Sequence, residues 1–134
     1  MRYIGLLDTG PDGAFGIVFP DCPGCTAMGK DENEAFANAI EALAEWLGDC
    51  APDERPAPRG IEDLRRDPEV DEQIRGGAIF LLVPFIQEKG RPTRANISLD
   101  AGLLESIDEA AATLRLTRSG FLAQAAREKI ERSA

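Results

Sequence analysis

The chain has 134 residues, enough for one compact domain and a small second module but not for two large domains. It contains no histidine, which excludes Ser-His-Asp triads and zinc sites built on histidine, and its apolar runs are too short to cross a membrane. The net charge of −9 is uneven, because residues 1–90 hold 8 Lys or Arg against 18 Asp or Glu, whereas residues 91–134 hold 7 against 6. The acidic first part suits a basic protein partner, although its charge could instead serve only solubility. Duplex DNA would be repelled by this part and could approach only the second part.

Three strands are predicted at the N-terminus. Residues 3–8 and 14–19 are strand-like apolar stretches, and the Gly, Pro and Asp residues between them favour an antiparallel hairpin. A short run over residues 25–29 follows a turn that contains Pro and Gly, and it can return as a third strand. The pattern therefore predicts a three-stranded meander.

A helix is predicted to begin after Asp31, whose side chain can cap the first turn, with Glu34 at the spacing of a capping box. Gly48 is its expected end. One apolar face recurs at helical spacing and can cover the sheet. This face comprises Phe36, Ala39, Ile40, Leu43 and Leu47, flanked by Trp46.

The middle of the chain predicts a loop, short helices and a late strand. Residues 48–60 contain three prolines and form the loop, and a short helix over residues 61–66 can resume after Pro68. Residues 78–83 are apolar at every position, which predicts a strand buried on both faces that joins the sheet and ends at Pro84. Residues 1–87 are thus expected to form an α+β domain with the element order β-β-β-α-(α)-β.

A linker is predicted over residues 88–92, followed by a second module over residues 93–134 that is too short to build a core alone. Its first residues alternate, with Arg94, Asn96 and Ser98 on the opposite side from the apolar ones. Two helices follow. The first is capped by Asp100 and runs to about residue 116, and the second is capped by Thr117. The order strand, helix, helix in a small module predicts an obligate oligomer.

A lone strand leaves its backbone groups unpaired, and antiparallel pairing with a second copy is the simplest remedy. The resulting ribbon would present Arg94, Asn96 and Ser98 to DNA bases, since arginine matches the acceptors of guanine and asparagine matches adenine. The apolar residues would form the dimer core. The predicted core residues are Ile97, Leu99, Leu104, Ile107, Phe121 and Leu122.

Thr117, Arg118 and Ser119 open the second helix of this module. Free amides, hydroxyls and a cation at this place can bind a DNA phosphate and fix the register of the protein on DNA. The alternative is that Thr117 and Ser119 only cap the helix and that Arg94 is a solvated strand residue.

Both parts of the chain resemble the HicB antitoxins. Residues 92–132 resemble the ribbon-helix-helix tail of this family, and residues 3–47 resemble its N-terminal domain through four short stretches. The stretches are Tyr3-Ile4-Gly5-Leu6, Gly16-Ile17-Val18-Phe19-Pro20-Asp21, Pro23-Gly24-Cys25-Thr26-Ala27-Met28-Gly29 and Glu34-Ala35. The resemblance implies a partial RNase H-like N-terminal domain and a C-terminal ribbon-helix-helix.

The resemblance also implies two partners and a function. HicB proteins bind HicA, a small basic toxin with a double-stranded-RNA-binding-like fold that cleaves messenger RNA, and they repress their own operon through the tail. The expected partners are therefore a HicA-type toxin, operator DNA and a second copy of the chain through residues 93–134, with further pairing into tetramers left open. No cofactor and no enzyme activity are expected.

The three cysteines are Cys22, Cys25 and Cys50, and the first pair departs from the family, which usually has leucine at position 22. Two cysteines at this spacing can form a redox couple or half of a zinc site. Because neither histidine nor a second pair completes a metal site, buried structural roles are favoured. An odd cysteine count and an N-terminus unlike a signal peptide favour the cytoplasm.

Two alternative functions remain open. An RNase H-like fold suggests a nuclease, whose candidate metal-binding carboxylates are Asp8, Asp12, Asp21 and Glu41, although Asp12 and Asp21 lie in turns where acidic residues are common. The second alternative is a DNA-binding repressor with a ligand-sensing N-terminal domain and no toxin. An adjoining reading frame for a small basic protein would favour the antitoxin.

Overall fold

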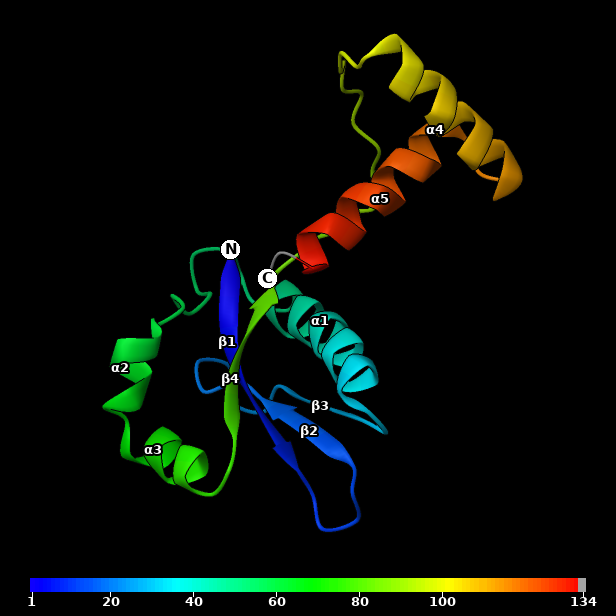
Figure 1. The fold of residues 1–134 in the computed structure, drawn as a ribbon. Coiled ribbons are helices and arrows are strands. Elements are labelled where there is room, and N and C mark those ends of the chain that lie inside the picture. The colour runs from blue at the N-terminus through cyan, green and yellow to red at the C-terminus, as the bar shows by residue number, and fades with distance from the viewer. Residues whose placement is uncertain (133–134) are drawn as a thin grey trace. The chain divides into compact units, whose positions relative to one another are not determined.

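A computed structural model describes residues 1–132, which fall into two compact units (Figure 1). The N-terminal unit is Met1–Gln87, and the C-terminal unit begins at Glu88. None of the helices in the described part of the chain is long and apolar enough to span a lipid bilayer.

The N-terminal unit is built on a four-stranded antiparallel sheet with the order β3-β2-β1-β4. Its strands are β1 (Arg2–Thr9), β2 (Phe15–Val18), β3 (Thr26–Gly29) and β4 (Ile79–Pro84). The predicted meander is confirmed, and the late strand joins it beside β1. The mixed α+β class is likewise confirmed.

Helix α1 (Glu32–Gly48) covers one face of the sheet. Asp31 caps it by accepting a hydrogen bond from the Glu34 N–H at 2.8 Å, and the Glu34 carboxylate accepts one from the Lys30 N–H at 3.3 Å. The predicted start and end of the helix are therefore confirmed. Small and apolar side chains form the buried face, in contact with Tyr3, Ile17 and Ala27 of the sheet. The buried helix residues are Ala35, Ala39, Leu43 and Leu47.

The first turn of α1 lies directly on the end of β3. A Cβ atom added to Gly29 would lie 2.8 Å from the Cα of Ala35 and closer still to its backbone nitrogen. Real Cβ atoms do not approach backbone this closely, so glycine is required at this position. The close approach lets Ala35 be completely buried.

Two short helices, α2 (Ile61–Arg65) and α3 (Pro68–Arg75), cover part of the opposite face. Leu64 and Val70 pack there against Ile4 and Leu6 of β1, forming a second core. Asp67 caps α3 by accepting a hydrogen bond from the Glu69 N–H at 3.0 Å. The predicted interruption and resumption of the helix at Pro68 is confirmed.

Strand β4 differs from its prediction as a strand buried on both faces. It pairs only with β1 and forms an edge of the sheet, with Ile79 56% exposed and Leu82 39% exposed, although Val83 is fully buried. An uninterrupted apolar run indicates average burial but does not say how many strands flank it. The prediction of full burial is therefore wrong.

An ion-pair network attaches the loop before α2 to the turn between β2 and β3. The Asp21 side chain, 7% exposed, accepts hydrogen bonds from the Arg59 backbone N–H at 2.8 Å and from Arg59 Nε at 2.6 Å. Arg59 Nη1 also donates to Asp67 at 3.2 Å. Arg59 thus joins the turn after β2 to the loop before α2 and to the start of α3.

Replacing Arg59 by alanine is expected to lower the free energy of unfolding by about 1–3 kcal/mol, because a buried carboxylate loses a charged partner. Urea unfolding monitored by the fluorescence of Trp46 measures the change. Arg66→Ala is the matched control, since Arg66 is exposed and pairs with Asp63 only at 3.5 Å; its effect should stay within about 0.5 kcal/mol. Equal effects of the two variants would contradict a structural role of the network.

The C-terminal unit contains α4 (Ala101–Thr113) and α5 (Arg118–Arg132). The predicted caps are confirmed: Asp100 accepts a hydrogen bond from the Leu103 N–H, and Thr117 Oγ1 accepts one from the Gly120 N–H. Helix α4 ends earlier than expected because Arg115 adopts a left-handed conformation with φ of 57°. Residues 93–99 are neither helical nor paired as a strand within this single chain.

Candidate functional site

The polar row predicted to contact DNA lies in the segment before α4. Arg94, Asn96 and Ser98 are all exposed. Asn96 borders a depression of about 330 Å³ between this segment and helices α4 and α5, and Arg118 and Ser119 line the same depression. The structure therefore brings one of the predicted base contacts next to two of the predicted phosphate contacts.

The predicted dimer-core residues are incompletely covered in one chain. Ile97 is 65% exposed and Leu99 is also exposed, whereas Leu104, Phe121 and Leu122 are half-buried. Within the described part of the C-terminal unit, the buried apolar residues are Ile107 and Ala111. The two helices thus leave most of their apolar surface open to solvent.

Thr117 and Arg118, at the start of α5, have different partners in the single chain. The Thr117 hydroxyl caps the helix, as the alternative interpretation proposed. Arg118 donates two hydrogen bonds to Asp108, from Nε at 2.8 Å and from Nη2 at 2.7 Å. This bidentate pair lowers the pKa of Asp108 and raises that of Arg118. A phosphate would have to compete with Asp108 for the guanidinium group.

Asp108 was not singled out from the sequence. It lies ten residues before Arg118 and on a different helix, so no local spacing rule connects them. Only the packing of α4 against α5 brings the carboxylate to the arginine.

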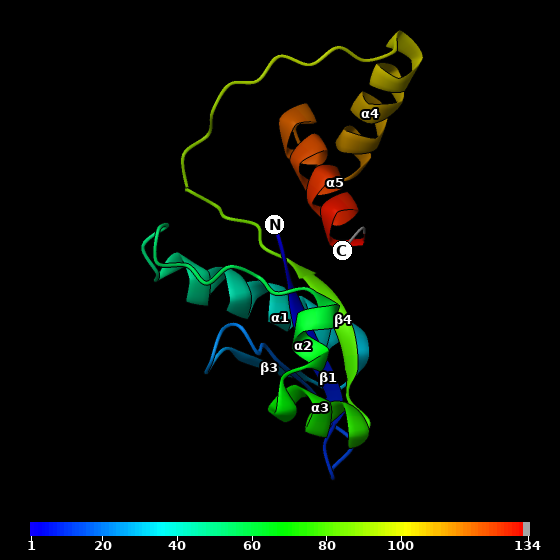
Figure 2. The same cartoon turned by 90° about the vertical axis from the view of Figure 1, so that its left-hand side faces the viewer.

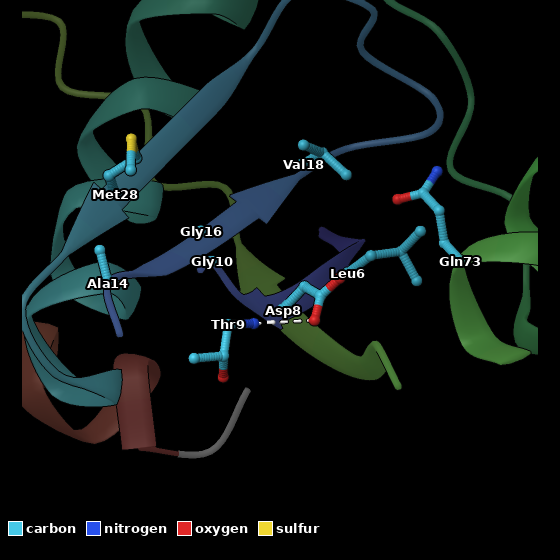
Figure 3. Close-up of a pocket in the computed structure, with 9 residues that line it drawn as sticks. All are labelled: Leu6, Asp8, Thr9, Gly10, Ala14, Gly16, Val18, Met28 and Gln73. Atoms are coloured by element: carbon cyan, nitrogen blue, oxygen red, sulfur yellow. Dashed lines mark hydrogen bonds between the residues drawn. The ribbon is translucent and has the colours of Figure 1, made fainter. Parts of the chain in front are cut away.

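A second depression, of about 250 Å³, lies on the sheet of the N-terminal unit (Figure 3). Met28 and Ala14 stand on one side of it and Leu6 and Gln73 on the other, with Gly16 between them. Its walls are mainly apolar side chains of β1, β2 and β3. Sequence reasoning did not identify this surface, because its residues are separate in sequence and meet only through strand pairing.

The four carboxylates proposed as metal ligands of a nuclease do not converge on one site. Asp21 is bound to Arg59, Asp12 accepts a hydrogen bond from the Ala14 N–H in a turn, and Asp8 accepts one from the Thr9 N–H. Glu41 is exposed on α1, which covers the other face of the sheet. Over residues 1–132 no three Cys, Asp or Glu side chains gather in a way that could hold a metal ion. The nuclease alternative thus gains no support from the geometry.

The cysteine pair is part of the core beneath α1. Cys22 is completely buried and Cys25 nearly so. Burial, together with the neighbouring Cys25 and Asp21, raises the pKa of Cys22 to about 12, and burial raises the pKa of Cys25 as well. Both thiols are therefore protonated near neutral pH, which makes them poor nucleophiles and poor metal ligands.

The thiols are expected to be protected from reagents in the folded protein. Ellman's reagent at pH 8 should modify at most Cys50, which is half-buried, and should modify all three cysteines once urea unfolds the chain. Rapid modification of Cys22 without denaturant would contradict a purely structural role for the pair.

Similarity to known proteins extends over both units. The family model described as the HicB-like antitoxin of bacterial toxin-antitoxin systems matches residues 3–126. A search of curated proteins finds no significant match.

Several solved structures are similar to this chain, two of them over nearly its whole length. The crystal structure of the antitoxin HicB from Burkholderia pseudomallei has 29% sequence identity, covers 98% of this chain and 99% of its own, and gives a TM-score of 0.53. The crystal structure of antitoxin HicB3 has 30% identity, 98% coverage of both chains and a TM-score of 0.51. A chain of the HicA3 and HicB3 toxin-antitoxin complex has 26% identity, covers 64% of this chain and 99% of its own, and gives a TM-score of 0.50. With a family match from residue 3 to residue 126, this chain belongs to the HicB-like antitoxins of bacterial toxin-antitoxin systems.

Proposed function

We propose that this antitoxin neutralises a HicA-type toxin with its N-terminal unit and represses its own operon by binding operator DNA with its C-terminal unit. The finer fold assignments belong to the same proposal. The order of three strands followed by a helix supports a partial RNase H-like domain, and a non-helical segment followed by two helices supports a ribbon-helix-helix.

The observation that carries the DNA-binding part is the uncovered apolar surface of the C-terminal unit. Exposed Ile97 and Leu99 alternate with exposed polar residues in a segment that has no strand partner within its own chain. Pairing with the same segment of a second copy would satisfy the backbone and bury the apolar side chains. Arg94, Asn96 and Ser98 would then face outward on both copies, where a major groove can receive them.

Charge and similarity support the toxin-binding part. Residues 1–87 hold 7 Lys or Arg against 17 Asp or Glu, which suits a basic partner. The solved structure of HicA3 with HicB3 is a toxin-antitoxin complex, which supports the binding of this chain to a toxin of the HicA type. We therefore assign the two partners to different units.

The deciding experiment is co-expression of the tagged chain with the small basic protein of the adjacent reading frame. Copurification of the two proteins, together with restored growth of cells that express the toxin, is the expected result. Analytical ultracentrifugation of the chain alone should give at least a dimer. DNA binding without any toxin partner would instead favour the repressor with a ligand-sensing N-terminal domain.

A further inference from the structure

The second face of the sheet in the N-terminal unit is covered over only part of its width. Helices α2 and α3 pack over β1 and β4, where Leu64 and Val70 meet Ile4 and Leu6. Figure 2 views the sheet from the side of these helices and shows them over β1 and β4, with β3 standing clear. Val18 of β2 reaches the core beneath α2 and α3, and Gln73 of α3 borders the depression over β2 and β3.

The strand register places two rows of side chains on this face of the sheet. Asp8 pairs with Gly16, and Gly16 pairs with Met28, so these three residues are aligned across β1, β2 and β3. The next row on the same face consists of Leu6, Val18 and Thr26, of which Leu6 is buried in the core beneath α2 and α3. Alternate residues of a strand share a face, and both rows therefore point in the same direction.

Gly16 leaves a hollow in the middle of the first row (Figure 3). A Cβ atom added at Gly16 would meet only the carbonyl oxygen of Ala27, at 3.9 Å, so packing within the unit does not require a glycine there. Met28, 64% exposed, stands at the rim. Its flexible side chain can adapt to an irregular partner surface. The result is an apolar recess bordered by an exposed methionine.

Charge around the recess favours a cationic partner. Asp8 is the one charged residue among the described residues that line it, and its side chain is exposed. The unit that carries the recess is strongly acidic as a whole. An apolar recess with a carboxylate at its rim suits an apolar side chain flanked by a lysine or arginine.

We infer that the open half of the sheet centred on Gly16 is the surface on which the basic toxin docks. The inference rests on the proposed neutralising function and adds the place and chemistry of the contact. The toxin inserts an apolar side chain into the recess against Met28 and sets a cationic side chain beside Asp8. A side chain seated in a recess and shielded from water contributes much of the binding energy of such an interface.

The first test fills the recess in the full-length chain. Gly16→Leu should weaken binding of the purified basic protein from the adjacent reading frame by about tenfold or more, measured by isothermal titration calorimetry at fixed salt. Its melting temperature should be unchanged or higher, because glycine weakens a strand. Gly48→Leu is the matched control, since a Cβ at the end of α1 meets no atom within 4 Å. This control should bind like the wild type.

The second test distinguishes a local contact at Asp8 from the overall electrostatic attraction between the acidic unit and the toxin. Asp8→Lys should weaken binding by about tenfold or more, because it places a positive charge beside the cationic side chain of the toxin. Glu41→Lys makes the same change in net charge on α1, which covers the other face. Its effect should be several-fold smaller because salt screens distant charges.

The outcomes are distinguishable. Loss of binding in Gly16→Leu and Asp8→Lys, with unchanged binding in Gly48→Leu and a several-fold smaller loss in Glu41→Lys, supports the inference. Wild-type affinity in Gly16→Leu, or equal losses in Asp8→Lys and Glu41→Lys, overturns it while leaving the neutralising function in place. A changed oligomeric state of Gly16→Leu with unchanged toxin affinity also overturns it and assigns the face to a second copy. Failure of the wild type to bind the toxin overturns the proposed function itself.

Discussion

Gly29→Ala is expected to destabilise the N-terminal unit by about 3 kcal/mol, because the new methyl group would collide with the backbone of α1 rather than with a movable side chain. The Cβ would lie 2.8 Å from the Cα of Ala35, in the first turn of the helix. Relieving the collision requires α1 to move away from β3, which opens the core around Ala35 and Ala39. Urea unfolding followed by the fluorescence of Trp46 measures the loss.

Gly16→Ala is the matched control for this substitution. Gly16 also lies in a strand of the same sheet, but a Cβ there would meet only the Ala27 carbonyl oxygen, at an ordinary contact distance of 3.9 Å. The control should leave stability unchanged or raise it by up to about 1 kcal/mol, because alanine loses less backbone entropy than glycine. Similar unfolding midpoints for the two variants would mean that the contact between β3 and α1 tolerates a side chain.

Arg94→Ala is expected to abolish most specific DNA binding. The proposed dimer would carry two copies of each outward side chain, so the substitution would remove two contacts, each contributing about 1–3 kcal/mol. The combined loss is roughly 2–6 kcal/mol, and Asn96→Ala should act in the same range. Fluorescence anisotropy with labelled operator DNA at a fixed salt concentration measures the change.

Arg66→Ala provides the control for charge, since Arg66 is an exposed arginine of the N-terminal unit. It should bind the operator like the wild type, and the Arg94 variant should still bind the toxin. Operator affinity unaffected by both Arg94→Ala and Asn96→Ala would remove the ribbon from the DNA interface.

Local chemistry made several elements predictable from the sequence. The helix starts at Asp31, Asp100 and Thr117 each depend on a side chain that caps an amide three residues away, so the signal lies within one turn. The strands of the meander follow from apolar stretches separated by turn residues. The family was also recognisable, because its motifs occur in order along both parts of the chain.

Features that depend on distant residues were not predictable. The bond between Asp21 and Arg59 joins positions 38 residues apart, and the pair of Asp108 and Arg118 joins two helices. Strand β4 was placed in the sheet correctly, but its edge position depends on the order of all four strands. The recess at Gly16 likewise exists only because the register brings Met28 and Asp8 to either side of it.

If the C-terminal unit represses the operon as proposed, its sparse interior would make repression depend on the abundance of the protein. Because α4 and α5 bury little beyond Ile107 and Ala111 within one chain, the proposed ribbon acquires its full stability only as two chains associate. In a cell where the antitoxin is scarce, occupancy of the operator would then rise with the square of its concentration. Transcription would resume steeply as the pool is depleted, well before every molecule has been lost.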